Sequence, residues 1–197
     1  HGRVTRPIKT ESRGVMRLMR PLYLDDSGQV TYFIINPGGA YFGEKYEINV
    51  EVGPRANLLL SGQGATRIYK TPRQPAVQEM TVMLAPKSRL EYLPDQVIAY
   101  RDARYRQDTK VSMVPDAQCF IAEIVTPGWD PDDDKFTFAG MHLRTEVYAD
   151  QAGLVCIDNV RIEPGTIGKA LHGIGYMEGA THMGSILIFG AHTRGDY

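Results

Sequence analysis

The sequence has few cysteines, no excess of either charge and no long apolar run. Only two of its 197 residues are cysteines, Cys119 and Cys156, which excludes a disulfide framework and fits a cytosolic protein. The 22 basic and 23 acidic residues give a net charge of −1, so nucleic acid and membrane surfaces are not expected partners. Apolar runs such as "ILIF" at 186–189 are too short to span a bilayer, and no signal peptide is visible.

Helical periodicity is missing too, since no window carries an apolar stripe with the helical period. Short alternating segments separated by turn signals such as "VGPR", "APKS" and "VPDA" predict strands instead. We therefore predict a mainly β fold with stacked or coiled sheets, in one domain over 1–197, with little or no helix. The strands are expected at 14–21, 29–36, 46–52, 56–62, 78–85, 89–93, 96–102, 104–114, 118–125, 135–149 and 153–162. The clearest alternation puts the following residues on one face: Ala103, Tyr105, Gln107, Thr109, Val111 and Met113.

A complete phosphate-binding loop is absent, although "GGAYFGEK" at 38–45 comes close to one. Such a loop requires a helix N-terminus after its second glycine, because free N–H groups there hold the phosphates. Here the alternating segment "YEINVEV" follows, and Glu44 would repel a phosphate. The stretch is therefore interpreted as a structural turn in which Gly38, Gly39 and Gly43 supply backbone angles that other residues resist. No ATP or GTP binding is expected.

Signatures of catalysis or of a closed metal site are also lacking. No nucleophile-elbow motif occurs, and the histidines and cysteines include no pair with the spacing of structural zinc ligands. His142 is expected on the outward face of its strand, and "DPDDD" at 130–134 is interpreted as a solvated hairpin loop without the spacing of a calcium loop. A pair of carboxylates converging across a cleft would indicate a hydrolase or sugar-binding module, and sequence alone leaves that alternative open.

Glu123 is the most unusual ionisable residue. Its neighbours on the same face of the strand "CFIAEIV" are Cys119, Ile121 and Val125, so a carboxylate projects from an apolar face. Buried ionisable groups are paired or functional. Two explanations stay open: a core ion pair with an arginine, or a functional role.

Several motifs in order resemble the UreD (UreH) family of urease accessory proteins. They are "NPGGAYFGEKYEINVEV", "GQGATRIYKTP", "LEYLPDQVIAY" and "AEIVTPGW", followed by "MHLRTEVY" and "IGYMEGATHMGS", which resemble the Gram-positive branch. The match runs from about Gly2 to about Ser185. The chain departs from the family pattern at Glu44, where Asp is usual, and at Trp129, where Arg is usual. Family members also continue for some further residues, so this chain resembles a C-terminally truncated member.

The resemblance implies an assembly factor rather than an enzyme, with helically wound strands. Members work with UreF and the GTPase UreG on apo-urease and help to load nickel, so GTP hydrolysis would belong to UreG. The implied location is the cytoplasm, with no tightly bound cofactor and with nickel only in transit. On that implication Glu123, with Asp95 as a weaker companion, becomes a candidate transit ligand. The alternatives are a hydrolase or carbohydrate-binding module and a structural interaction domain that passes no metal.

Overall fold

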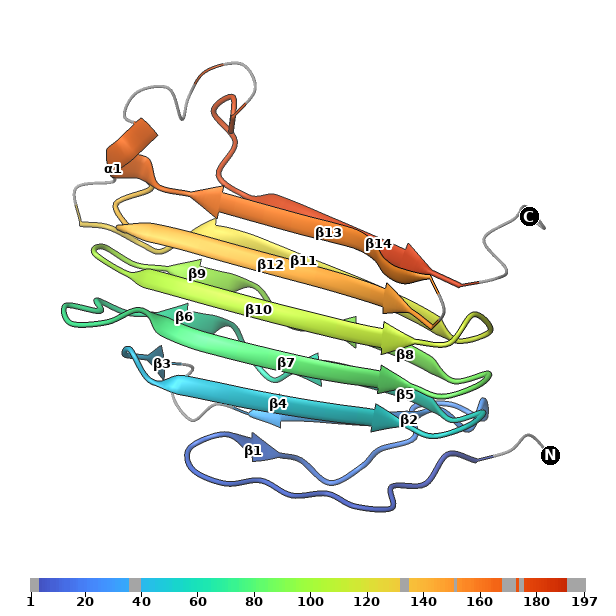
Figure 1. The fold of residues 1–197 in the computed structure, drawn as a ribbon. Helices are drawn as coiled ribbons and strands as arrows, with labels where there is room; N and C mark the ends of the chain where they lie inside the picture. The colour runs from blue at the N-terminus through green and yellow to red at the C-terminus, as the bar shows by residue number, and fades with distance from the viewer. Residues whose placement is uncertain are drawn as a thin grey trace.

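The computed structural model describes residues 4–35, 40–131, 135–150, 152–167, 173 and 176–190. Its strands form two mixed sheets that face each other (Figure 1). Sheet A contains β1 (Arg17–Leu18), β2 (Val30–Ile35), β3 (Ala40–Tyr41), β5 (Asn57–Gly62), β6 (Thr66–Ile68), β8 (Arg89–Leu93), β9 (Val97–Ala99), β11 (Gln118–Pro127) and β14 (Met183–Phe189). Sheet B contains β4 (Lys45–Val52), β7 (Ala76–Leu84), β10 (Arg104–Met113), β12 (Gly140–Ala149) and β13 (Gly153–Ile162). The helix α1 covers Pro164–Ile167.

The chain winds between the two sheets as a coil. It passes from β2 in sheet A to β4 in sheet B, returns to β5, and repeats this path through β7, β8, β10, β11 and β12. Strands of successive coils therefore lie parallel, as in the pairs β4 with β7 and β7 with β10. Among the described strands, β1, β13 and β14 pair antiparallel with their neighbours. The prediction of a mainly β, helically wound fold with almost no helix is confirmed.

Stacked turns carry the chain from sheet B back to sheet A. Each is a four-residue turn with proline second, closed by a backbone hydrogen bond of 3.1 Å from the fourth residue to the first, at 53–56, 85–88 and 114–117. Proline fits the second position because its φ is already fixed there. Arg55 and Lys87, third in the first two turns, have φ of 60° and 58°. A positive φ at that position is typical of a type II turn, which favours glycine.

Replacing Lys87 with glycine is expected to stabilise the protein. A left-handed residue with a side chain is strained by about 1–2 kcal/mol, and the extra freedom of glycine in the unfolded chain offsets about half of that. Chemical denaturation should show a gain of about 0.5–1 kcal/mol in the free energy of unfolding. The matched control is Asp116→Gly in the third turn, where φ is not positive. That change should destabilise, and a gain at Asp116 equal to the gain at Lys87 would contradict the strain argument.

At the opposite end of the coils, three aromatic rings stack on one another. The centroids of Phe42 and Tyr69 are 5.4 Å apart, and those of Tyr69 and Tyr100 are 4.8 Å apart, with nearly parallel ring planes. The next coil has Gly128 at this level, and a Cβ added there would lie 2.7 Å from the Tyr100 ring. Glycine is therefore required beside Tyr100 because of close packing.

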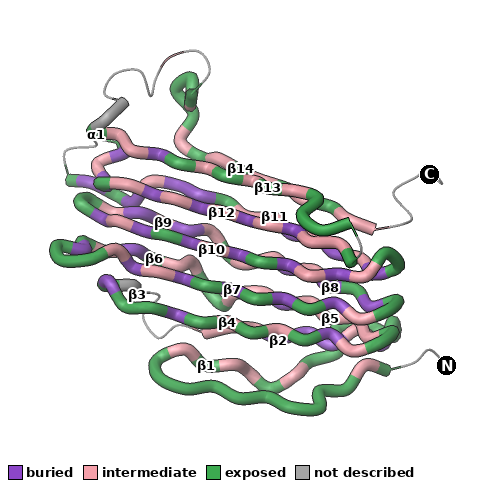
Figure 2. The backbone as a smooth tube through the Cα atoms, viewed as in Figure 1, coloured by how far each residue is buried: buried purple, intermediate pink, exposed green. Residues whose placement is uncertain are grey.

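The core lies between the sheets, and the outer face of sheet B is charged. Along the strands buried and exposed residues alternate, as Figure 2 shows. On the outer face, Lys45 Nζ lies 2.8 Å from Glu47 and 2.9 Å from Glu79, and Arg161 pairs with Glu163. Exposed pairs of this kind contribute little to stability, so this face is a solvated surface.

Some local predictions need correction. The alternation at 103–113 is confirmed, since its apolar face is buried, and Lys45 begins a strand rather than a helix. The strands β3, β6 and β14 were not expected, and residues 135–139 are not in a strand. The "DPDDD" segment does not join a hairpin, because β11 and β12 lie in different sheets, and Asp130 is buried rather than solvated. None of the helices in the described part of the chain is long and apolar enough to cross a membrane.

The glycines of the near-P-loop are only partly described. Gly43 has φ of 99°, and a Cβ on it would lie 2.7 Å from the carbonyl oxygen of Gln74. Gln74 Nε2 also donates to the Gly43 carbonyl at 2.6 Å. Both the backbone angle and the close approach therefore require glycine at this position. Gly38 and Gly39 lie outside the described residues.

Candidate functional site

Two neighbouring coils of sheet A are each broken into two short strands at the same height along the sheet, and Glu123 lies beside these breaks. The chain leaves the sheet between β5 and β6 and again between β8 and β9. Strand β11 runs through without a break, pairing with β8 over residues 118–121 and with β9 over 125–127. Between these two pairings, residues 122–124 of β11 pair on the other side with β14, and this stretch contains Glu123. The β8–β9 break beside it contains Asp95. Both predicted acids therefore lie at the same level of the fold, on neighbouring coils.

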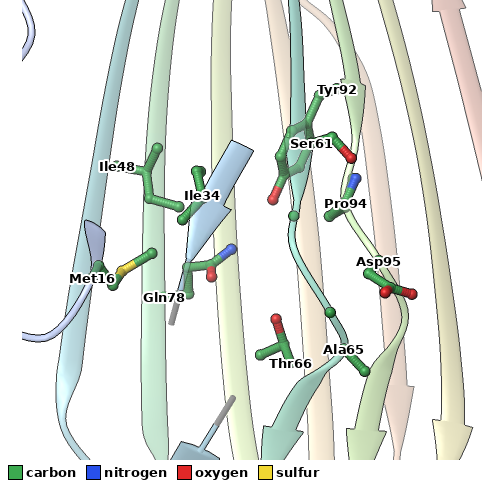
Figure 3. A pocket seen from close by; sticks show the side chains of 12 residues that line it. Met16, Ile34, Ile48, Ser61, Ala65, Thr66, Gln78, Tyr92, Pro94 and Asp95 are labelled. Atoms are coloured by element: carbon green, nitrogen blue, oxygen red, sulfur yellow. The ribbon is translucent and has the colours of Figure 1, made fainter. Parts of the chain in front are cut away.

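A small cavity opens at this interruption (Figure 3). Its volume is about 30 Å³, room for a water molecule but not for a sugar or nucleotide. Gln78 from sheet B and Asp95 line opposite sides of it. Asp95 is exposed, and its carboxylate accepts a hydrogen bond of 2.8 Å from the backbone N–H of Gln96. Asp95 therefore marks the rim of the cavity.

Glu123 points from sheet A into the space between the sheets. Its Oε1 accepts a short hydrogen bond from Nε2 of Gln107, on β10 of sheet B. The hydroxyl of Tyr105 donates to Oε1 of the same glutamine at 2.9 Å, which fixes the orientation of the amide. Gln107 is paired in register with Gln78 of the neighbouring strand. The side chains of Gln78, which lines the cavity, and Gln107, which bonds Glu123, therefore form a row between the cavity and Glu123.

Glu123 also lies near enough to Asp158 of β13 to feel its negative charge. Ser185, the register partner of Glu123 on β14, donates to Asp158 Oδ2 at 2.9 Å. Thr109 of β10 lies two strands from β13, because it is in register with Thr145 of β12, which in turn pairs with Asp158. The Thr109 hydroxyl is buried and has no hydrogen-bond partner among the described residues. We name this group the polar layer: Gln78, Gln107, Thr109, Glu123, Asp158 and Ser185.

Burial is the main cause that raises the pKa of Glu123 above its ordinary value. The hydrogen bond from Gln107 acts in the opposite direction, and the negative charge of Asp158 raises the pKa further. Uptake of a proton relieves both the burial of the charge and its repulsion by Asp158. A cation between the two carboxylates would do the same.

Glu123→Gln should remove a pH dependence of stability. A raised pKa means that stability is fully present below the ordinary value of 4.5 and falls as pH rises through the folded-state pKa. The melting temperature of Glu123→Gln minus that of the wild type should therefore grow by a few degrees from pH 4 to 8, since about 1 kcal/mol shifts a chain of this size by roughly 2–4 °C. The change Glu163→Gln, at a carboxylate that pairs with Arg161 outside the polar layer, serves as the control. A Glu123→Gln difference that stays constant over this pH range would show that Glu123 is not shifted.

The two predicted site residues, Glu123 and Asp95, do not contact each other, and Gln107 and Asp158 lie near Glu123 instead. The arginine partner considered for Glu123 is not found in the described part of the chain, where Gln107 and Asp158 take that place. Between Glu123 and Asp95 no hydrogen bond or ion pair occurs among the described residues. The alternation in 103–113 already placed Gln107 and Thr109 on the inward face. Asp158 and Ser185 carried no such signal, because their strands meet Glu123 only through the fold.

The polar layer does not resemble a permanent metal centre. In the part of the chain that the structure describes, no group of three or more His, Cys, Asp or Glu side chains could hold a metal ion. His142 Nε2 lies 2.7 Å from Asn159 Oδ1 on the outer face of sheet B, away from the carboxylates. Burial raises the pKa of the Cys119 thiol to about 12, so it stays protonated and is a poor ligand.

Comparison with known proteins agrees with the resemblance found in the sequence. The family model of the UreD urease accessory protein matches residues 1–195. Urease accessory protein UreD of Arthrobacter sp. (strain FB24) is 46% identical over 92% of this chain and 63% of its own length. UreD of Actinomyces naeslundii is 46% identical over 91% and 65%, and UreD of Bacillus cereus is 34% identical over 98% and 70%. The chain thus spans less than two thirds of the first two relatives, and it belongs to the UreD family of urease accessory proteins.

Proposed function

We propose that this chain is a scaffold for urease maturation that binds apo-urease together with UreF and UreG and assists nickel incorporation. Membership of a family of urease accessory proteins supports a role in urease assembly. The observation that carries the finer proposal is the polar layer, with a partly buried ionisable carboxyl between two sheets. On this proposal the chain acts in the cytoplasm and is a maturation factor rather than a catalyst, with GTP hydrolysis in UreG.

Nickel is the cargo in this proposal, and its transit requires weak, exchangeable ligands. Oxygen ligands from carboxylates and amides exchange more readily than a cage of cysteines and histidines. In our proposal Asp95 receives the cation at the rim of the cavity, and Glu123 with Asp158 holds it between the sheets. Cation entry would displace the proton whose binding the surroundings of Glu123 favour. Neither Asp95 alone nor Glu123 with Asp158 provides enough ligands to hold nickel tightly, and weak binding favours release of the ion over its storage.

The hydrolase or sugar-binding alternative is less consistent with the geometry. The carboxylates of Glu123 and Asp158 lie on the inner faces of the two sheets and are only partly exposed. A small-molecule pocket usually measures about 300–1,000 Å³. The cavity beside the polar layer holds about 30 Å³. The structural alternative, an interaction domain that passes no metal, differs from our proposal only in the role of the polar layer.

Reconstitution tests the proposal. Apo-urease, UreF, UreG, GTP and Ni²⁺ are mixed with or without this chain, and urease activity and bound nickel are measured. The chain should co-purify with apo-urease and UreF and raise the fraction of active urease several-fold. Equal activation with and without the chain would contradict the maturation role, and hydrolysis of glycosides by the isolated chain would support the alternative.

A further inference from the structure

The basic residues are unevenly distributed along the chain. The first 20 residues contain six of the 22 basic residues and only one of the 23 acidic residues, so the rest of the chain carries a net charge of −6. We name residues 4–20 the basic arm, and Figure 1 shows it in blue along one end of the stack of coils. Its five basic residues all lie at exposed positions: Arg6, Lys9, Arg13, Arg17 and Arg20.

The basic arm is fastened to the rest of the fold at its start, middle and end. The N–H of Thr5 donates to the carbonyl of Gly28 at 2.8 Å, and its hydroxyl accepts from the N–H of Asn57 at 2.9 Å. The hydroxyls of Thr10 and Tyr32 lie 3.1 Å apart, and β1, within the arm, pairs with β2. The arm is therefore a fixed strip of surface, and a partner that binds it need not order it first.

Most of the positive charge of the basic arm is not neutralised within the described part of the chain. Glu11 pairs with Lys9 at 3.5 Å and with Arg13. The other three basic residues form no ion pair among the described residues: Arg6, Arg17 and Arg20. Like charges gathered on one strip repel one another, and an acidic surface of another molecule would relieve that repulsion.

The basic arm also exposes aliphatic side chains between its charges. Ile8, which follows Pro7 between Arg6 and Lys9, is fully exposed. The arm contains no aromatic ring on which a nucleic-acid base could stack. Its exposed aliphatic side chains are separated by charges, so they do not form the continuous apolar face that enters a membrane. An apolar contact flanked by charges is instead typical of a protein interface, with an apolar centre and a polar rim.

We propose that the basic arm is a docking surface for an acidic face of a partner protein, with an apolar contact at Ile8. Carboxylates of the partner pair with Arg6 and Lys9 on either side of this contact and with the arginines further along the arm. Attraction of this kind accelerates association and makes binding depend on salt. The inference rests on the proposed function, because the partner belongs to the same maturation complex.

Binding of the chain to apo-urease and to UreF, measured separately by surface plasmon resonance at low and at high salt, tests the proposal. Arg6→Glu with Lys9→Glu should weaken one of these complexes at least about tenfold at low salt, mainly through slower association. Ile8→Ser should weaken the same complex without changing its salt dependence. The matched control, Lys87→Glu with Arg106→Glu, changes the net charge equally at exposed positions outside the arm and should bind as the wild type does.

The control also matches the arm variant in its local contacts. Arg106 pairs with an acid two residues further along the chain, as Lys9 does. All variants should melt within about 2 °C of the wild type, because surface changes alter stability little.

Four results would overturn the proposal. If the arm variant binds both proteins as tightly as the wild type, the docking surface lies elsewhere and the proposed function still stands. If the wild type binds neither protein, the proposed function fails as well. Equal losses in the arm variant and the control would show that net charge alone acts. Tighter binding of the wild type to duplex DNA or to phosphatidylserine vesicles than to either protein would show that the arm serves a different class of partner.

Discussion

Replacing Arg101 with alanine should lower the free energy of unfolding by about 3–5 kcal/mol, because it removes the guanidinium that pairs with the buried carboxylate of Asp130. The Asp130 side chain is 1% exposed. Arg101 holds it with two bonds, Nε to Oδ2 at 2.8 Å and Nη2 to Oδ1 at 2.6 Å. The hydroxyl of Thr137 adds a third at 3.1 Å. These contacts attach the connection between β11 and β12 to the turn that follows β9.

The double variant Arg101→Ala with Asp130→Ala separates a buried charge from lost packing. Removing both side chains also removes the buried carboxylate, so the double variant should be more stable than Arg101→Ala alone. The exposed pair Arg161–Glu163 provides the control, and Arg161→Ala should change stability by at most about 1 kcal/mol. Urea denaturation measures all three. A double variant that is no more stable than Arg101→Ala alone would contradict the buried-charge argument.

Gly128→Ala should destabilise the protein by about 1–3 kcal/mol, because overpacking displaces a ring that cannot move freely. The added Cβ would lie 2.7 Å from Cγ and Cδ1 of Tyr100, close to the root of the side chain. Tyr69 stacks on Tyr100 at 4.8 Å, so the ring has little room to retreat. Thermal unfolding with a calorimeter gives the loss directly.

Two further variants test this packing argument. Gly53→Ala places a Cβ where no atom lies within 4 Å and should change stability by no more than about 0.5 kcal/mol. In a Tyr100→Ala background the clash is gone, so adding Gly128→Ala should have almost no further effect. A loss of the same size in both backgrounds would show that Gly128 is required for a reason other than Tyr100.

Local patterns predicted the strands well but not their connections. Alternation identified 104–114 because inward residues such as Tyr105 and Val111 face a core while outward residues face water. That pattern says nothing about which sheet a strand joins. The coil becomes recognisable only when the turns at 53–56, 85–88 and 114–117 are compared, since each places a proline second. Strand β14 was missed because its approach is rich in glycine and histidine, which are typical of a loop.

The candidate site could be predicted only in part. Glu123 attracted notice because a carboxylate on an apolar face requires a partner or a function. Its partners could not be named, since Gln107 and Asp158 belong to other strands that the fold brings opposite it. Asp130 was mispredicted in the opposite direction, as exposed rather than buried, because the acidic cluster at 130–134 is typical of a solvated loop. Its first aspartate is buried, since Arg101 of another coil reaches it.

Nickel-dependent activation of urease by Glu123→Gln, compared with the wild type and the control Glu163→Gln, tests the central claim most directly. Glutamine keeps the shape of the side chain and one oxygen but removes the charge that would hold a cation. We predict that Glu123→Gln binds apo-urease and UreF normally and melts no lower than the wild type, but activates urease at least about tenfold more slowly, the loss that about 1.4 kcal/mol produces. Activation at the wild-type rate would contradict a role of the polar layer in nickel transit.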